Sequence, residues 1–294
     1  MKVVRASAEL TPQPRAVAIG SFDGVHRGHR SVLEAVRGTG LEPAVLTFDP
    51  HPRIALGNKV ELLTTLERRL ELFEDAGIET VLVAAFTPDL QRLTPDVFAD
   101  QCLRAIGVEC VVAGEDFRFG VRRSGDLALL ESLGFEIVVP TEIDGVSSTA
   151  IRAALGEGDV DGAADMLGRP FELDGVVVAG DQRGGTLGYP TANLRLEPDL
   201  ACPQYGIYAG SAVGHRAAVS IGTNPHYGGM ERRIEPYLLD YEGDLLGQRL
   251  VVELWERLRD EAVFESEQAL VEQIARDVEA TRGARRPDHP TTDS

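Results

Sequence analysis

The most informative residues in the chain are two histidines, His26 and His29, in the stretch AVAIGSFDGVHRGH. They follow a short apolar run that stops at Gly20, and a sequence compatible with a helix begins at His29. A strand, a tight turn and a helix start often bind phosphate, because free N–H groups and the helix dipole both favour an anion. Gly28 removes a side chain where a phosphate would approach the backbone. The pattern predicts that both imidazoles contact one phosphate chain.

Two histidines at this spacing are also compatible with zinc binding or with incidental placement on a surface. No nearby cysteine or histidine completes a zinc site. Phosphate binding is favoured by the preceding strand, the glycines and Phe22–Asp23. The stretch resembles the G-x-F-D-x-x-H-x-G-H signature of the HxGH nucleotidyltransferases. This resemblance implies that the two histidines contact ATP phosphates and stabilise the transition state of adenylyl transfer. It also implies a nucleotide-binding turn formed by Gly20, Ser21, Phe22, Asp23 and Gly28.

Composition restricts the classes of protein to consider. A length of 294 residues favours two domains, and a hydrophobic share of 43% is ordinary for a globular protein. The net charge of −18 argues against a nucleic-acid partner and against binding to an anionic membrane surface. The three cysteines form no CxxC pair, and no signal peptide or membrane span is recognisable. We therefore expect a cytoplasmic protein.

Apolar strands alternate with amphipathic helices through the first half of the chain. Strands are expected at 16–19, 44–48, 81–86, 110–113 and 135–139, with helices at 29–37, 63–76, 94–107 and 126–133. This alternation predicts an α/β domain with a doubly wound parallel sheet covered by helices on both faces. Ligands of such sheets bind beyond the carboxyl ends of the strands, where the histidine turn is expected.

Three further loops at strand ends carry polar side chains: Asp49–Arg53, Gly114–Gly120 and Val146–Arg152. Each has an ordinary alternative, namely a rigid turn, a hairpin and a helix N-cap. We expect all three loops at the same edge of the sheet, and this shared position favours a ligand-binding site. Ser148 and Thr149 would offer hydroxyls and helix N–H groups to phosphate, and the Arg152 guanidinium can bind phosphate oxygens in a fork.

The motifs TFDPHP, GEDFRFG and SSTAIR, in this order after GSFDGVHRGH, resemble the adenylyltransferase half of the bacterial bifunctional riboflavin kinase/FMN adenylyltransferases. The resemblance covers nearly all of residues 16–155. It implies two groups of phosphate-binding residues and one position near the nucleotide and flavin: His26 and His29; Ser148, Thr149 and Arg152; and Asp116. The histidines and Arg152 would stabilise the transition state.

The pattern changes after Gly168–Pro170, where we expect the domain boundary. Short strands separated by glycine turns, without intervening helices, predict an antiparallel β-barrel followed by one C-terminal helix at 266–281. The polar, proline-containing tail is expected to be disordered. The predicted organisation is therefore an adenylyltransferase domain at 1–168, a barrel domain at 169–282 and a tail at 283–294.

A glycine-bearing loop at 180–193, GDQRGGTLGYPTAN, is usually no more than a flexible connection, but its Pro-Thr-Ala-Asn end is specific. A threonine hydroxyl and an asparagine amide oxygen suit Mg²⁺ that retains waters and nucleotide phosphates. The loop resembles the flavokinase signature. That resemblance implies that Thr191 and Asn193 hold the metal of Mg-ATP, within an ATP- and flavin-binding loop of Gly180, Gly184, Gly188, Pro190, Thr191 and Asn193.

The same resemblance includes the turn at 222–225 and the strand at 234–240, and it assigns Glu235 as the base that activates the 5′-hydroxyl of riboflavin. Spacing alone does not distinguish this carboxylate from Glu231 or Glu253. Two positions depart from the family pattern. Gly185 replaces a long side chain, and His226 replaces a small hydroxyl residue. These departures concern ATP affinity and not the type of reaction.

These features predict an enzyme that phosphorylates riboflavin to FMN and then adenylylates FMN to FAD. ATP is the second substrate of both reactions, Mg²⁺ is the implied cofactor, and no nucleic-acid or membrane partner is expected. One alternative is an HxGH nucleotidyltransferase for another phosphorylated acceptor, with a barrel that only binds. A non-catalytic flavin-binding protein is the other alternative.

Overall fold

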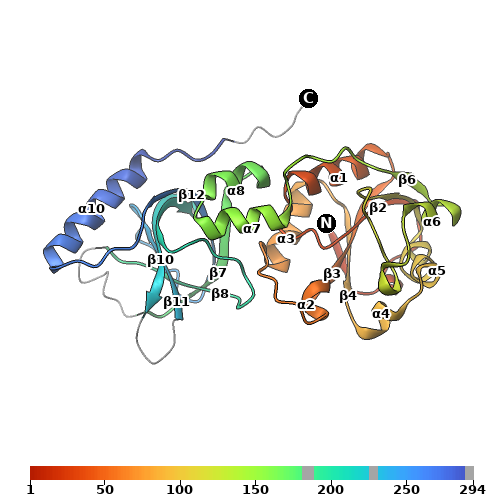
Figure 1. The fold of residues 1–294 in the computed structure, drawn as a ribbon, viewed down its shortest axis with the longest axis horizontal. Helices are drawn as coiled ribbons and strands as arrows, with labels where there is room; N and C mark the ends of the chain where they lie inside the picture. Colours follow the sequence, from red (N-terminus) through yellow and green to blue (C-terminus); the bar gives the residue numbers. More distant parts are fainter. Residues whose placement is uncertain (181–188, 225–230, 289–294) are drawn as a thin grey trace. The chain divides into compact units, whose positions relative to one another are not determined.

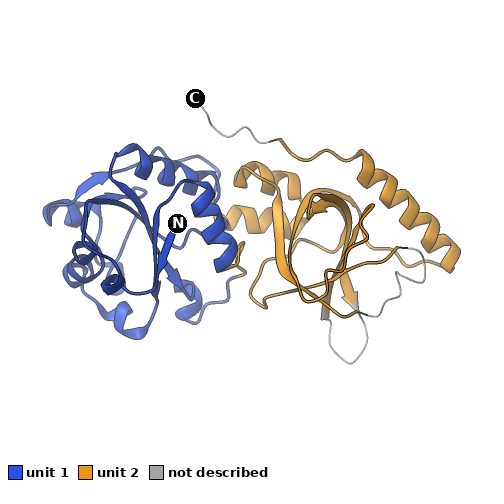
Figure 2. Ribbon diagram, turned by 180° about the vertical axis from the view of Figure 1, so that it is seen from behind, with its two compact units in different colours: residues 1–60, 66–146 blue, residues 61–65, 147–294 orange. Residues whose placement is uncertain are grey.

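The structure is a computed structural model that describes residues 1–180, 189–224 and 231–288, without the side chains of Asn224 and Glu231 (Figure 1). The chain divides into two compact units (Figure 2). Unit 1 comprises Met1–Val60 and Leu66–Val146, and unit 2 comprises Glu61–Thr65 and Ser147–Ser294.

Unit 1 contains a parallel sheet with strand order β1-β4-β3-β2-β5-β6. Its strands are β1 (Lys2–Val4), β2 (Arg15–Ile19), β3 (Glu42–Asp49), β4 (Thr80–Ala85), β5 (Val108–Val112) and β6 (Glu136–Val138). Its α-helices are α1 (Arg27–Gly38), α2 (Pro52–Ala55), α3 (Leu66–Asp75), α4 (Pro88–Arg92), α5 (Pro95–Phe98) and α6 (Leu127–Ser132). Helical turns of other types cover Ser7–Glu9, Ala99–Leu103, Arg104–Ile106 and Val121–Arg123.

Both faces of this sheet are buried, as the apolar strands predict. On one face, Ala16 and Ala18 pack with Leu33 of α1 and Phe73 of α3. The alternate residues of the same strand, Val17 and Ile19, point to the other face and pack with Phe98 and Leu130. The predicted doubly wound parallel sheet is therefore confirmed. The chain leaves β2 toward β3 and later returns to β5 on the other side of β2, so the order reverses beside β2.

The sequence did not predict β1, and it predicted one helix at 94–107 where the structure has α5 followed by a π-helical and a 3₁₀ turn. Strand β1 has only three residues, too few for a pattern, and it forms because it pairs with β4 at the sheet edge. The helical region ends as predicted at Gly107, which adopts a left-handed φ of 80°.

Unit 2 contains an antiparallel sheet with strand order β11-β10-β9-β12-β7-β8. Its strands are β7 (Phe171–Val178), β8 (Asn193–Leu196), β9 (Gly206–Ala212), β10 (His215–Asn224), β11 (Glu231–Leu238) and β12 (Arg249–Arg259). The N–H of Ala192, just before β8, donates to the carbonyl of Pro236 in β11 at 3.0 Å. This bond joins the two edge strands, and the sheet becomes a nearly closed barrel, as predicted.

Helices α7 (Ser148–Glu157) and α8 (Val160–Leu167) belong to unit 2, although the sequence placed them in the first domain. Ile151 and Leu155 of α7 and Leu167 of α8 are fully buried in the same apolar cluster as the barrel strands. The two compact units therefore divide near Val146, while the assignment of the two activities to 1–168 and 169–282 stays a prediction. The physical reason for this division is that the apolar faces of both helices are covered by the barrel.

A short segment, Glu61–Thr65, also packs with the barrel although its chain neighbours on both sides lie in unit 1. The N–H of Leu62 donates to the carbonyl of Asp199 at 2.6 Å, and the Leu62 carbonyl accepts from Ala201 at 2.7 Å. The hydroxyl of Thr65 donates to Asp174 Oδ2 at 2.5 Å. Arg249 donates to both oxygens of the same carboxylate, each at 2.8 Å.

The last helix, α10 (Glu267–Gly283), agrees with the predicted C-terminal helix. The sequence predicted a disordered tail from residue 283, whereas the structure packs the first tail residues against the barrel. Ala284 is buried beside Trp255, and Arg286 donates to both carboxylate oxygens of Glu253 at 2.8 and 2.9 Å. Arg216 also donates to the carbonyl of Thr281 at 2.9 Å. Residues 289–294 lie outside the described part of the chain.

We expect Asp174→Asn to lower the free energy of unfolding of unit 2 by about 2–4 kcal/mol, because it weakens a buried carboxylate held by Arg249 and Thr65. Trp255 is the only tryptophan and lies in this unit, so its emission during urea unfolding measures the change. Asp260→Asn is the control, since that side chain is 82% exposed in its pair with Arg257. The control should change stability by less than about 0.5 kcal/mol. Equal effects of the two substitutions would contradict the prediction.

Candidate active sites

The turn that joins β2 to α1 adopts an unusual backbone conformation. Phe22 and Val25 both have positive φ angles, 50° and 41°, although neither is glycine. Such angles are costly for these side chains and persist only where packing fixes them. Both side chains are buried, and the Phe22 ring packs edge-on against Phe73 and His29 at centroid distances of 5.5 and 5.2 Å. Apolar burial therefore fixes the turn that precedes the histidines.

The two histidines lie together at the start of α1. His26 is the N-cap residue, and its Nδ1 accepts the backbone N–H of His29 at 3.3 Å. The two rings are stacked, with centroids 3.6 Å apart and planes 16° apart. A Cβ on Gly28 would lie 3.3 Å from the His26 ring, a tighter contact than most side chains make. The structure thus places the two imidazoles side by side.

His29 is held in its neutral form. Burial lowers its pKa well below the usual 6.5, and the neighbouring His26 and Arg69 lower it further. Its Nδ1 is buried and has no hydrogen-bond partner among the described residues. A neutral imidazole beside a second imidazole can donate one hydrogen bond to a phosphate without the repulsion of two adjacent cations.

Arg69 is a residue of this site that the sequence analysis missed. It lies on α3, is only 4% exposed, and donates from Nη1 to the carbonyl of Ser21 at 2.7 Å. Nη2 donates to the carbonyl of Phe48 at 3.3 Å. The sequence did contain a signal. Position 69 is three residues after Leu66 and four before Phe73, so it falls on the predicted apolar face of that helix. A charged residue at such a position requires an explanation.

Other predicted residues of unit 1 follow neighbouring strands of the same sheet. His51 is buried after β3 and caps α2, since its Nδ1 accepts the N–H of Arg53 at 3.2 Å. Asp116 is exposed in the loop after β5. Strands β3, β2 and β5 are adjacent and parallel, so these loops share the edge that carries the histidine turn. Their contact with nucleotide or flavin stays a prediction.

The second predicted phosphate motif lies on α7. Ser147 is the N-cap residue, with its hydroxyl accepting from Ala150 at 3.1 Å, and Ser148 and Thr149 form the first turn. Arg152 donates from Nε to the carbonyl of Glu61 at 2.5 Å. These residues belong to unit 2 and the histidines to unit 1, so their joint action on one phosphate chain stays a prediction.

The Pro-Thr-Ala-Asn segment of unit 2 lies beside β11. Ala192 donates to Pro236, and the ring of Tyr189 packs edge-on against that of Tyr237 at 5.4 Å. A Cβ on Gly180 would collide with the side chain of Asn193, because β7 and β8 pair at this point. The segment is therefore held against the strand that carries Glu235. Pro190, Thr191 and Asn193 are described, whereas Gly184, Gly185, Gly188 and His226 lie outside the described residues.

The two carboxylates Glu235 and Glu253 lie in different surroundings. Ile234 and Pro236 are buried, so Glu235 faces the opposite side of β11, where it is 29% exposed and 3.8 Å from Arg233. Burial raises the pKa of Glu253, but hydrogen bonds from Arg286 and Trp255 outweigh it and lower the pKa overall. Glu253 is thus a fully engaged structural carboxylate and a poor candidate for a base. The side chain of Glu231 lies outside the described residues.

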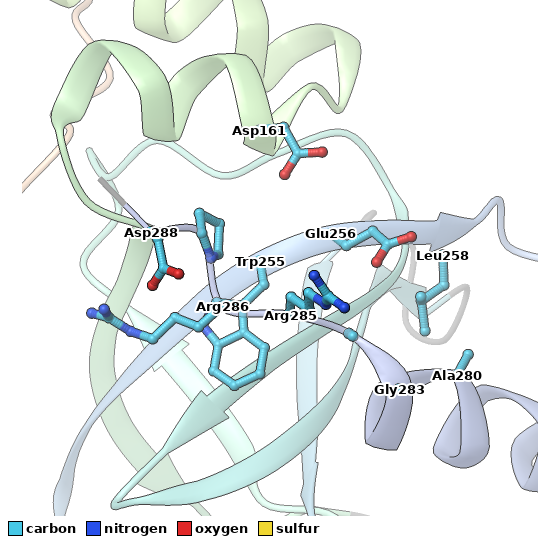
Figure 3. A pocket seen from close by; sticks show the side chains of 11 residues that line it. Asp161, Trp255, Glu256, Leu258, Ala280, Gly283, Arg285, Arg286 and Asp288 are labelled. Atoms are coloured by element: carbon cyan, nitrogen blue, oxygen red, sulfur yellow. The ribbon is translucent and has the colours of Figure 1, made fainter. Parts of the chain in front are cut away.

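A separate hollow of 710 Å³ lies in unit 2 beside the end of α10 (Figure 3). Trp255, Leu258 and Arg285 are among the residues that line it, together with Asp161 of α8. It contains none of the predicted site residues. The hollow marks where the chain beyond α10 crosses the barrel, and it is distinct from the Pro-Thr-Ala-Asn segment.

The fold and the two sites define a class of protein: an HxGH-type nucleotidyltransferase unit followed by a flavokinase-type barrel. Family models agree with this division. The model described as FAD synthetase matches residues 8–150, and the model described as riboflavin kinase matches residues 167–284. The chain belongs to the family of bifunctional riboflavin kinase/FMN adenylyltransferases, as the following relatives show.

Proteins with that name match the chain over almost its whole length. The relative from Listeria monocytogenes is 36% identical, covering 93% of this chain and 93% of the relative. The relative from Escherichia coli is 35% identical, covering 94% and 96%. The relative from Pseudomonas fluorescens is 36% identical, covering 98% and 99%.

A solved structure from Streptococcus pneumoniae has a similar fold, with a TM-score of 0.84, 32% identity, and coverage of 95% of this chain and 98% of that one. That protein is described as a macrolide-efflux protein. Within the residues that the structure describes here, no helix combines the length and apolar composition needed to cross a bilayer.

We expect the neutral state of His29 to make unit 1 less stable in mild acid. Its folded pKa lies below the unfolded value of 6.5, so the unfolded chain binds the proton more readily. Stability should fall as the pH drops below 6.5, by at most about 1.4 kcal/mol per pH unit. Amide hydrogen exchange of α1 at pH 7.5 and 5.5 measures the effect. His29→Gln should remove this part of the pH dependence, while barrel peptides respond equally in both proteins. An unchanged pH dependence in His29→Gln would refute the assignment.

Proposed function

We propose that this chain phosphorylates riboflavin to FMN in unit 2 and adenylylates FMN to FAD in unit 1, using one ATP in each reaction. The observation that carries the proposal is that one chain contains both sites. Unit 1 has stacked histidines at a helix start beyond a parallel strand, and unit 2 has a Thr/Asn segment hydrogen-bonded to the strand of Glu235. The names of the relatives support the same pair of activities. A cytoplasmic location stays a prediction from the sequence.

In the kinase reaction, the 5′-hydroxyl of riboflavin attacks the γ-phosphorus of ATP, and ADP leaves. Glu235 accepts the hydroxyl proton as the new O–P bond forms. Glu235 is 29% exposed and lies 3.8 Å from Arg233, whereas both oxygens of Glu253 are bound by Arg286. The neighbouring Pro-Thr-Ala-Asn segment would hold the phosphates close to this base.

The same segment fits a magnesium ion that arrives with ATP. Thr191 and Asn193 offer neutral oxygen donors, and the Asn193 side chain lies in the space that a Cβ on Gly180 would occupy. Two protein donors suit Mg²⁺, which keeps waters and phosphate oxygens for its remaining positions. When bound, the ion would neutralise charge on the transferring phosphate.

In the adenylyl reaction, a phosphate oxygen of FMN attacks the α-phosphorus of ATP, and pyrophosphate leaves. The nucleophile is already ionised, so the protein needs to orient the two phosphates and stabilise negative charge. His26 and His29 would donate hydrogen bonds to the phosphate chain at the N-terminus of α1. Arg152, Ser148 and Thr149 would bind further phosphate oxygens.

Substitutions should separate the two activities. His29→Ala should lower FAD formation by at least about 100-fold and leave FMN formation near the wild-type rate. Glu235→Gln should lower FMN formation by about 100-fold or more, yet still convert supplied FMN to FAD. Chromatographic separation of riboflavin, FMN and FAD over time measures both. A folded variant that lost both activities would contradict the two-site proposal.

The alternative of another phosphorylated acceptor makes a different prediction. The purified protein should be incubated with ATP, Mg²⁺ and either FMN or other phosphate monoesters, such as pantetheine phosphate and a polyol phosphate. We expect pyrophosphate release with FMN to exceed that with the other acceptors by at least about 100-fold in kcat/KM, because a site built to bind one acceptor discriminates strongly. A preference for another acceptor would reassign unit 1 and leave the kinase proposal intact.

A further inference from the structure

We propose that Arg69 is a positioning residue for adenylyl transfer, which holds the histidine turn against the carboxyl end of β3 by binding the carbonyls of Ser21 and Phe48. The inference rests on the proposed function of unit 1 and extends it to a residue outside the recognised motifs. The two hydrogen bonds, of 2.7 and 3.3 Å, join the first residues beyond β2 to the end of the adjacent strand.

The partners of Arg69 are unusual for a buried cation. Its hydrogen bonds within the described residues go to two backbone carbonyls, and its Nε is buried there without a hydrogen-bond partner. Burial lowers the pKa of Arg69, while Asp23 and Asp49 act in the opposite direction from farther away. A buried charge held only by carbonyls is expensive to keep. A site that binds several phosphates supplies a reason to keep this arginine, because the phosphates would add negative charge in direct reach of the turn that it holds.

Arg15 shows how this unit holds a buried arginine that has only a structural role. Arg15 lies at the amino end of β2, is 3% exposed, and pairs with Glu42 at 3.0 Å. Glu42 also accepts from Thr80 at 2.6 Å. Arg15 thus has a carboxylate in direct contact, whereas Arg69 lies at the opposite edge of the same sheet and, among the described residues, donates its hydrogen bonds to carbonyls. We therefore interpret Arg15 as part of a structural ion pair, and Arg69 as a cation at the sheet edge where phosphate is expected to bind.

Arg69 would act through the backbone of the turn. The Ser21 carbonyl accepts from Arg69 and, at 3.4 Å, from the hydroxyl of Thr47. The strained residues Phe22 and Val25 follow, and then the stacked histidines. Without this anchor the turn can relax, and the imidazoles move relative to the α-phosphorus. A displacement of about 1 Å in such a site costs about 100-fold in rate.

The test compares Arg69→Met and Arg69→Lys with the wild-type chain in FMN adenylylation. Arg69→Met should lower kcat by about 30- to 100-fold, with KM for ATP and FMN changed by less than about 5-fold. Arg69→Lys should recover part of kcat, because an ammonium keeps the charge but cannot bind both carbonyls in a fork. Riboflavin kinase activity, measured in the same samples, should stay near the wild-type value.

Arg15→Met is the matched control for lost stability. Arg15 is as buried as Arg69 and also donates to backbone carbonyls, those of Thr11 and Ile106, but it lies at the amino end of β2. It should raise hydrogen exchange in unit 1 to a similar degree while leaving the kinetic constants unchanged. Equal losses of kcat in Arg69→Met and Arg15→Met would overturn the proposal, as would a wild-type kcat in Arg69→Met.

A second measurement separates failure of this inference from failure of the proposed function. The NMR titration of the His29 ring, assigned by comparison with His29→Gln, does not need turnover. In Arg69→Met the pKa of His29 should rise toward 6.5, because a neighbouring positive charge is removed while His26 remains. If the wild-type chain makes no FAD, the proposed function fails and this titration still decides the role of Arg69. An unchanged ring signal and pKa in Arg69→Met would refute that role.

Discussion

The turn between β2 and α1 is the constraint on which the organisation of unit 1 depends. Two non-glycine residues in it, Phe22 and Val25, have positive φ angles. Packing of their buried side chains offsets the strain of this backbone conformation. This turn determines where α1 begins and places the rings of His26 and His29 against each other. A phosphate-binding geometry is therefore built from apolar packing beneath it as well as from the polar groups that face the ligand.

In unit 2 the corresponding constraint is closure of the barrel. One hydrogen bond from Ala192 to Pro236 joins the edge strands, and it aligns the Thr191–Asn193 segment with the strand of Glu235. The barrel core also receives Leu63, from the short Glu61–Thr65 segment, and Ile151 of α7. Segments distant in the chain thus become part of one core, which is why unit 2 combines Glu61–Thr65 with Ser147–Ser294.

Strong local patterns predicted much of the fold, and weak ones did not. The apolar strands at 16–19 and 44–48 and the helix stop at Gly107 were predicted because each pattern lies within a few neighbouring residues. Strands β1 and β8 were missed because three or four residues show no periodicity and form only beside a partner strand. The order of segments around the barrel and the membership of α7 depend on contacts between residues far apart in sequence.

The sequence by itself determined the chemistry available at each helix start and loop, because His26, Gly28 and His29 are close enough to act within one helical turn. It also determined which motifs the chain shares with its family. Only the tertiary structure showed that Glu253 is bound by Arg286, 33 positions further along the chain, which makes Glu253 a poor candidate for a base. It alone revealed Arg69 beneath the histidine turn. Burial and pairing are properties of the packed chain, and spacing along the sequence does not specify them.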